Sequence, residues 1–218
     1  MAVLRVLGVC LALAVATGAP AQNLPLRDEV VLEDAITVQL VGRELVAFDL
    51  EGSGRLVERL EIDEQLLYSG ARGRVAVALT DRRALAASPE SSSWRVERYR
   101  VSEAPSEYAD LSQGLAIVVT GQRALAFVGG SWAEEGLGPR EAILRTRAGS
   151  GAGVVLTDRR ALGVSARAGG FFEQKLRVSE EIEDVDAVSN IVTITTSERT
   201  LLFKAPTARW VEHKRPLR

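Results

Sequence analysis

The sequence predicts an all-β protein built from five copies of one structural unit. The segment "LTDRRAL" occurs twice, at residues 79–85 and 156–162, and a looser version, "VVTGQRALAF", lies between the two. Successive copies align on an apolar residue after a tight turn, at intervals of 39, 40, 37 and 39 residues. Such regular spacing indicates repeated supersecondary units. The aligned apolar residues are Val46, Leu85, Leu125, Leu162 and Leu201.

Each unit is predicted to contain four short strands. Runs such as "VAVALT" and "IVTITT" are short, rich in β-branched residues and bounded by turn residues. Two such runs joined by a two-residue turn make a hairpin, and a loop rich in Gly, Ser and Pro follows. A third strand then opens with a bulky residue, and a shorter fourth run closes the unit. Four short strands recurring about every 39 residues are typical of a β-propeller blade. Another closed or stacked all-β repeat is the alternative.

The N-terminal segment is predicted to be a secretory signal. Arg5 supplies a positive charge, residues 6–17 form an apolar stretch, and small residues follow. This pattern predicts cleavage after Ala21, and the apolar stretch is too short for a membrane anchor. Cys10 is the only cysteine, and it matches a lipoprotein box poorly, so we expect no lipidation and no disulfide. The mature protein is therefore expected in the periplasm or outside the cell.

The mature chain, residues 22–218, is predicted to form a single domain that closes on itself. The segment "LRDEVVLEDAI", residues 26–36, resembles "LRVSEEIEDVDAVSNI", residues 176–191. We therefore expect residues 27–35 to supply the fourth strand that the last unit lacks, and to close a ring of five blades. The five predicted repeats are approximately 36–73, 74–114, 115–151, 152–190, and 191–218 together with 27–35.

These repeats resemble the β-propeller superfamily, and most of all exported bacterial propellers whose blades carry a "vvvTdrralaf … W/F … E" pattern. The resemblance covers residues 27–215, which is nearly the whole mature chain. It implies a propeller fold. Proteins of this kind commonly serve as rigid platforms for partners, and fewer of them bind sugars or catalyse reactions, so the fold alone is a weak guide to function.

Two charged positions recur with the blades. One is a basic residue after the turn, which Glu44 replaces in the first blade, and the other is an acid at the start of the predicted fourth strand. A group that every blade repeats is expected to serve the scaffold, through an Arg–Glu contact within or between blades. The alternative is a ring of charge around an axial opening that holds an ion or a polar ligand. The residues are Arg83, Arg123, Arg160 and Arg199, with Glu29, Glu64, Glu103, Glu141 and Glu180.

The composition argues against several classes of function. Apolar residues make up 46% of the 218, charged residues 26%, and the net charge is −2 without any long basic run, so neither nucleic acid nor an anionic membrane is an expected partner. The only histidine, His213, lies near the C-terminus, and no phosphate-binding loop is present. The chain has many acids, but most occupy repeat-equivalent positions, so a hydrolase with paired carboxylates is a weaker interpretation. We expect no catalysis, no metal and no cofactor.

A binding function is therefore the main prediction. The loops that differ between blades are expected to share one face of the domain, and recognition usually occurs on such loops. An envelope protein is the first expected partner of a monomeric scaffold, and a saccharide stacked on exposed tryptophans is the second. The predicted binding residues are Arg72, Gln113, Asn190, Arg167 and Arg209, with Trp94, Trp132 and Trp210 as anchors at the rim.

Overall fold

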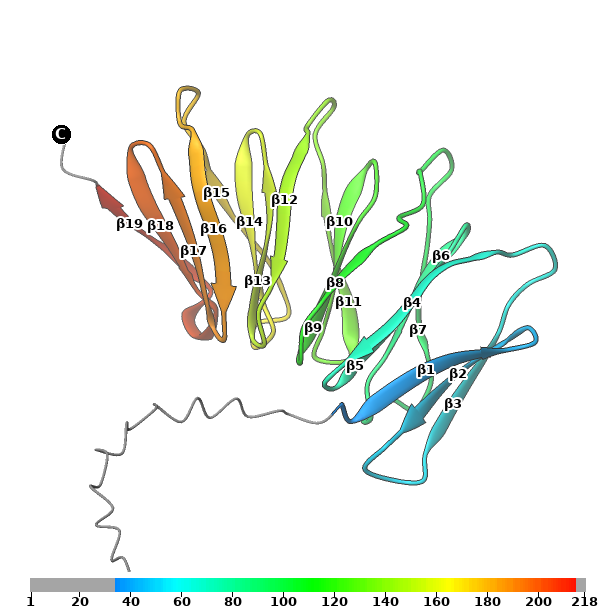
Figure 1. The fold of residues 1–218 in the computed structure, drawn as a ribbon. Helices are drawn as coiled ribbons and strands as arrows, with labels where there is room; N and C mark the ends of the chain where they lie inside the picture. Colours follow the sequence, from blue (N-terminus) through cyan, green and yellow to red (C-terminus); the bar gives the residue numbers. More distant parts are fainter. Residues whose placement is uncertain (1–33, 215–218) are drawn as a thin grey trace, which may run out of the picture. The chain divides into compact units, whose positions relative to one another are not determined.

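The computed structural model describes residues 34–214, which form five antiparallel β-sheets in chain order (Figure 1). The first sheet has three strands, β1 (Ile36–Val41), β2 (Glu44–Asp49) and β3 (Arg55–Arg59). The second has β4 (Leu66–Arg72), β5 (Val75–Thr80), β6 (Arg83–Ala87) and β7 (Arg95–Arg98). The third has β8 (Ala109–Leu111), β9 (Leu115–Val119), β10 (Arg123–Val128) and β11 (Ser131–Gly136).

The last two sheets follow the same order. The fourth has β12 (Ile143–Ala148), β13 (Ala152–Thr157), β14 (Arg160–Ser165) and β15 (Gly170–Lys175). The fifth has β16 (Ile182–Val188), β17 (Ile191–Thr196), β18 (Arg199–Lys204) and β19 (Arg209–Lys214), with a short 3-10 turn, η1 (Ala205–Thr207), before its last strand. Each sheet is thus a meander of the kind that forms a propeller blade, as the repeats predicted.

The boundary between units differs from the prediction by one strand. The run at 66–72 was expected to end the first unit, but β4 pairs with β5 in the second sheet, and β16 pairs with β17 in the same way. The reason is local, because a turn of only two residues joins each of these strands to the next one and makes them antiparallel neighbours. The second to fifth sheets therefore each begin with the strand that was expected to end the preceding unit.

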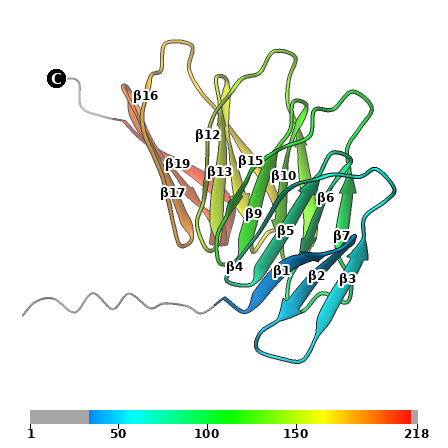
Figure 2. The same ribbon diagram turned by 45° about the vertical axis from the view of Figure 1, so that its right-hand side comes forward.

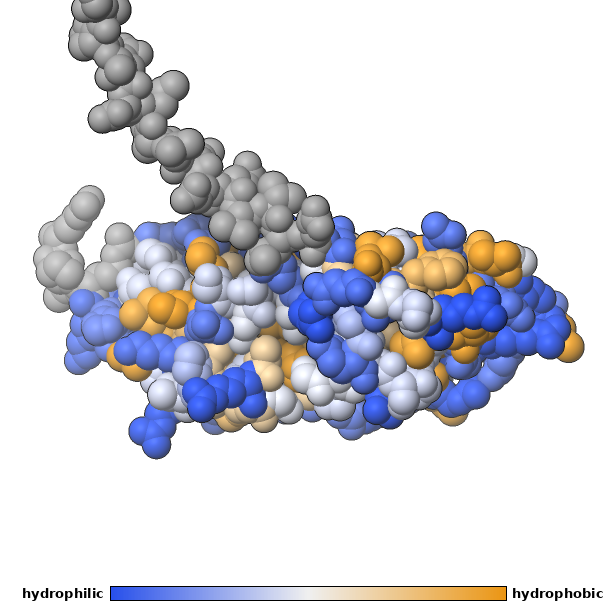
Figure 3. All heavy atoms as spheres, turned by 90° about the horizontal axis from the view of Figure 1, so that it is seen from below, coloured by the Kyte–Doolittle hydropathy of each residue, from blue (hydrophilic) through white to orange (hydrophobic). Residues whose placement is uncertain are grey.

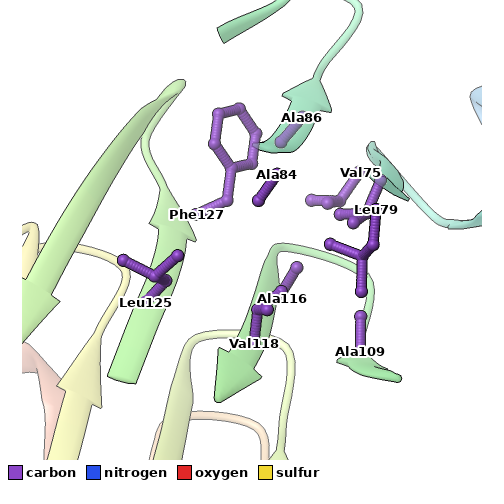
Figure 4. Packing of buried hydrophobic residues seen from close by; sticks show 10 residues of the cluster. Val75, Leu79, Ala84, Ala86, Ala109, Ala116, Val118, Leu125 and Phe127 are labelled. Carbon is purple, nitrogen blue, oxygen red and sulfur yellow. The ribbon is translucent and has the colours of Figure 1, made fainter. Parts of the chain in front are cut away.

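The sheets pack face to face, and the core consists of the layers between them. Between the second and third sheets, Leu79 and Val75 belong to one cluster with Val118, Leu125 and Phe127 (Figure 4). All five side chains are fully or almost fully buried. Small residues in β6 leave room for the Phe127 ring, so the two sheets approach closely. Burial of these apolar layers is the main source of stability for such stacked units.

The five sheets follow one another along an arc, and the first and last sheets lie at opposite ends of it in both views (Figures 1 and 2). The fifth sheet has four strands from residues 182–214 alone, so it does not lack the strand that residues 27–35 were expected to supply. Residues 27–33 lie outside the described part of the chain. The described residues therefore form an open array of blades.

The recurring "TDRR" turn has a structural explanation. The hydroxyl of Thr80 accepts a hydrogen bond from the N–H of Arg83 at 3.0 Å and donates one to the carbonyl of the same residue at 3.1 Å. The carboxylate of Asp81 accepts from the N–H of Gln65 at 2.9 Å, which ties the hairpin to the start of β4. Thr157 and Asp158 repeat both contacts in the fourth sheet. The motif is therefore part of the scaffold.

Candidate functional site

One end of each four-stranded sheet carries the turn between its first and second strands and the loop between its third and fourth strands, and at the same end the three-stranded first sheet has its β2–β3 loop. We call this end the loop face. Backbone hydrogen bonds join the two kinds of loop, from Leu50 to the carbonyl of Ala35 at 2.8 Å and from Ala166 to that of Gly151 at 3.1 Å. Figure 3 looks onto this face and shows hydrophilic residues interspersed with hydrophobic patches, toward the first sheet on the right and also toward the left.

The turns on the loop face pack directly on one another. The N–H of Arg74 donates to the carbonyl of Gln113 at 3.0 Å, across the joint between the second and third sheets. A Cβ on Gly114 would lie 2.3 Å from the carbonyl oxygen of Ser150, so only glycine allows this backbone approach. These turns were expected to be free to vary. The structure shows instead that they hold the spacing between sheets.

A hollow of about 460 Å³ opens on the loop face between the second and third sheets. Its apolar floor includes Val75 and Phe127, both almost fully buried. The β6–β7 loop contributes the polar residues Ser88, Glu90 and Ser91 to its wall. The rest of the lining is Arg74, Arg95, Gly114, Gly129 and Gly130. An apolar floor with a few polar groups is the usual composition of a binding site.

Two arginines give the hollow its charge, and they differ in their partners. Arg74 pairs with Glu51 at 3.0 Å and also with Glu90, whose pKa the Arg74 guanidinium lowers. Arg95 is exposed, and its guanidinium has no ion pair or hydrogen bond within the described part of the chain. The positive charge of Arg95 is therefore available to an acidic group of a ligand.

The residues predicted for binding are spread over four sheets. Arg72 ends β4 in the second sheet, Gln113 lies in the β8–β9 turn, and Arg167 lies in the β14–β15 loop. Asn190 and Arg209 both belong to the fifth sheet. All are exposed except Gln113, which is half-buried. The structure does not gather these five residues into one site, and none of them lines the hollow.

The three tryptophans lie in the joints between sheets. Trp94 is only 5% exposed, and its indole N–H donates to the carbonyl of Leu56 at 3.3 Å. The indole N–H groups of Trp132 and Trp210 donate to the preceding sheets in the same way, to the carbonyls of Arg95 at 2.9 Å and Phe172 at 2.8 Å. Trp94 is therefore not available to stack on a sugar, because packing between sheets already covers its ring.

The repeated arginines also span the joints. The side chain of Arg123 is 2% exposed, and its Nε donates to Glu103 at 2.9 Å within the third sheet's own segment. Its terminal nitrogens reach the second sheet, at Glu97 (2.6 Å) and the carbonyl of Arg98 (2.7 Å). The same arginine–glutamate pair recurs in the other four-stranded sheets, as Arg83 with Glu64, Arg160 with Glu141 and Arg199 with Glu180. Glu29 lies outside the described residues.

These contacts set the protonation of the buried acids. Burial by itself raises the pKa of Glu141, but hydrogen bonds from Arg160 and from the N–H of Gly138 outweigh it and lower the pKa to about 2. Burial and the bonds from Arg199 and Arg177 act on Glu180 in the same way, and its pKa is also about 2. Both carboxylates therefore stay charged across the physiological pH range, as parts of the scaffold rather than as proton-transfer groups.

The residues that line the hollow were not predicted from the sequence, although signals for them were present. Arg95 and Glu97 share one face of β7 by strand alternation, and Glu97 faces the next sheet. Ser88, Glu90 and Ser91 belong to one of the Gly-, Ser- and Pro-rich loops that were expected to differ between blades. What the sequence could not show is that this loop stands opposite the Gly129–Gly130 turn of the following sheet.

Within residues 34–214, no group of three or more His, Cys, Asp or Glu side chains is arranged to hold a metal ion. No helix in the same range has the length and apolar character needed to cross a membrane.

No protein-family model matches this chain, and no curated protein matches it either. Among solved structures, it is similar to apo AztD from Citrobacter koseri, with a TM-score of 0.40, 12% identity, and coverage of 84% of this chain and 60% of that one. It is also similar to the WD40 domain of SCAP from fission yeast (TM-score 0.34, 10% identity, 86% and 58%) and to YCF48 bound to a D1 peptide (0.33, 11%, 80% and 64%).

The chain spans 58–64% of the length of these three structures and 46% of HIRA(644–1017). One of these neighbours is a WD40 domain. At TM-scores of 0.40 or less and 8–12% identity, these likenesses carry no argument about this chain. The assignment of propeller-type blades rests on the sheets themselves.

Proposed function

We propose that this chain is a non-catalytic scaffold, exported to the cell envelope, that binds a protein partner on its loop face. The partner site is the hollow between the second and third sheets. The single observation that supports this choice is the position of Arg95, an exposed cation without a described partner beside the apolar floor at Phe127. An acidic segment that carries an apolar side chain matches both features.

The frame around the hollow supports this proposal. Phe127 packs against Trp132, with ring centroids 5.5 Å apart, and the Trp132 N–H is bonded to the carbonyl of Arg95. The main chain of Arg95 is therefore fixed, although its side chain is exposed. Arg74 is held by Glu51 and Glu90. A site with a fixed frame loses less conformational entropy on binding than a mobile loop does.

The site is tested by binding from envelope extract. The bait is the mature chain, with Arg95→Glu as the site variant and Arg145→Glu as the matched control, because Arg145 is also exposed but does not line the hollow. We expect one protein to be retained by the wild type and by Arg145→Glu and to be lost from Arg95→Glu. Retention by all three proteins contradicts the site, and so does binding of a glycan, but no protein, on an array.

Export is tested separately. Expression of the full chain in a bacterial host with an envelope, followed by intact-mass measurement of the envelope fraction, should give a protein that begins at Gln22. A cytoplasmic protein that retains residues 1–21 contradicts the proposed location.

A further inference from the structure

The two end sheets each present a face that no other described sheet covers. Leu45 and Ala47 face the second sheet, so strand alternation turns Gln39, Val46 and Val57 to the other side of the first sheet, as one row across β1, β2 and β3. Of these three, Val46 is only 7% exposed. On the fifth sheet, the outward row is Asp186, Thr193, Leu202 and Val211. Val57 and Ile191, on these two faces, are each 46% exposed. Both faces combine apolar and polar residues.

The internal joints follow one charge rule. The first residue of the third strand is arginine, and its guanidinium reaches the fourth strand of the preceding sheet. At three of the four joints it meets an acid and a main-chain carbonyl that are adjacent in sequence, whereas Arg199 bonds the carbonyl of Lys175 and its acid, Glu212, lies in its own sheet. Arg83 bonds Glu58 and the carbonyl of Arg59 (2.7 and 2.9 Å), and Arg160 bonds Glu135 and the carbonyl of Gly136 (3.0 and 2.6 Å).

The end faces carry other residues at the arginine position and at the acid position. Glu44 begins β2 as Arg83 begins β6, so an acid stands where every other sheet has arginine. On the fifth sheet, His213 occupies the position that Glu58 has on the first sheet. His213 lies opposite Thr200, as Glu58 lies opposite Leu45. His213 and Lys214 therefore take the places of the acid and its neighbour. All three residues, Glu44, His213 and Lys214, are exposed.

The outward face of the fifth sheet has a hollow beside its first turn. In the internal joints, the next sheet fills the equivalent place. The hollow measures about 420 Å³ and is lined by Asp186, Val188, Ser189, Asn190, Ile191 and Thr193. In the internal joints, the turn of the following sheet packs beside this position, as the bond from Arg74 to Gln113 shows. The fifth sheet has no following sheet in the described chain, so its turn at Ser189–Asn190 stays open.

We propose that the first sheet of a second copy of this chain packs on the outward face of the fifth sheet, with Glu44 of one copy against His213 and Lys214 of the other. The two faces of one copy do not pack on each other in the described residues, because the first and fifth sheets lie at opposite ends of the arc (Figure 1). The contact is head-to-tail, so it continues from copy to copy or closes into a ring of copies.

The experiment is sedimentation velocity of the mature protein over a range of concentrations, with Glu44→Arg and His213→Glu measured alone and mixed. Each variant alone places like charges in the joint and should weaken self-association about tenfold. In the mixture, the arginine introduced in one variant meets the glutamate introduced in the other, so association should return. Both substituted positions are exposed, and circular dichroism verifies that the variants fold.

Three results overturn the proposal. One is a wild-type protein that stays monomeric at every concentration. Another is equal association of wild type and both single variants. The third is that the single variants lose association and do not regain it on mixing, while one chain that carries both substitutions is monomeric and regains stability. That outcome means the two faces meet within one chain.

Discussion

Removal of Arg123 is the sharpest test of how the sheets are joined. Its guanidinium is almost completely buried and binds Glu103, Glu97 and Glu134 as well as the carbonyl of Arg98. Arg123→Met keeps most of the apolar stem and removes only the charged head. The joint between the second and third sheets then loses every bond that this side chain makes.

The magnitude depends mainly on what remains of Glu103. Its side chain is fully buried, and without Arg123 its carboxylate keeps only the N–H of Arg100, at 2.6 Å, and the hydroxyl of Thr120. A buried charge left without its partner costs about 3–5 kcal/mol. A domain of ordinary stability has about 5–15 kcal/mol in total, so the loss is large. Arg74→Met breaks pairs of half-exposed residues and should cost about 0–1 kcal/mol.

The measurement is urea unfolding followed by circular dichroism, for wild type, Arg123→Met, Arg74→Met and the double variant Arg123→Met with Glu103→Met. The double variant removes the buried charge together with its partner, so it should recover at least half of the loss. The reasoning is refuted if Arg123→Met costs no more than Arg74→Met, or if the double variant is less stable than Arg123→Met alone.

Three further outcomes follow from the same contacts. The free energy of unfolding should be level above about pH 4.5 and fall from there toward pH 2. The cause is that Glu141 and Glu180 have folded pKa values of about 2, so these groups take up protons in the unfolded chain at a higher pH than in the folded one. Acid titration followed by circular dichroism checks this, and Glu141→Gln should make the fall less steep. Gly163→Ala should cost about 1–3 kcal/mol in urea unfolding, since its new Cβ would lie 2.7 Å from the Phe203 ring. Gly170→Ala, with nothing within 4 Å of the new Cβ, is the matched control and should cost nothing measurable.

The repeat was strong enough to predict the kind of fold and the number of units. The strands are short and alternate in a regular way, and the recurring Thr and Asp mark each hairpin, so local chemistry determines each sheet. The order of strands within a unit was misplaced by one. A repeating series of four strands does not show at which strand each sheet begins. Only the pairing of β4 with β5 shows where a unit begins.

The candidate site was harder to predict, because it depends on contacts between units. Trp94, Trp132 and Trp210 looked like exposed anchors, but their indoles fill the joints. Arg95 looked like one more polar residue of a solvated strand. Arg95 matters because it lies beside Phe127 of the next sheet. The sequence of a strand does not reveal which residues of another sheet lie near it.

The most direct test of the binding site uses a photo-reactive amino acid placed at Ser91, which lines the hollow, and in a second protein at Gln122, in the β9–β10 turn at the opposite end of the sheets. Each protein is irradiated in envelope extract, and the adducts are identified by mass spectrometry. The proposal predicts one protein adduct from Ser91, attached at an acidic segment, and absent when Arg95→Glu is added. An adduct from Gln122 alone, or one from Ser91 that persists with Arg95→Glu, would contradict the assignment of the hollow as the partner site.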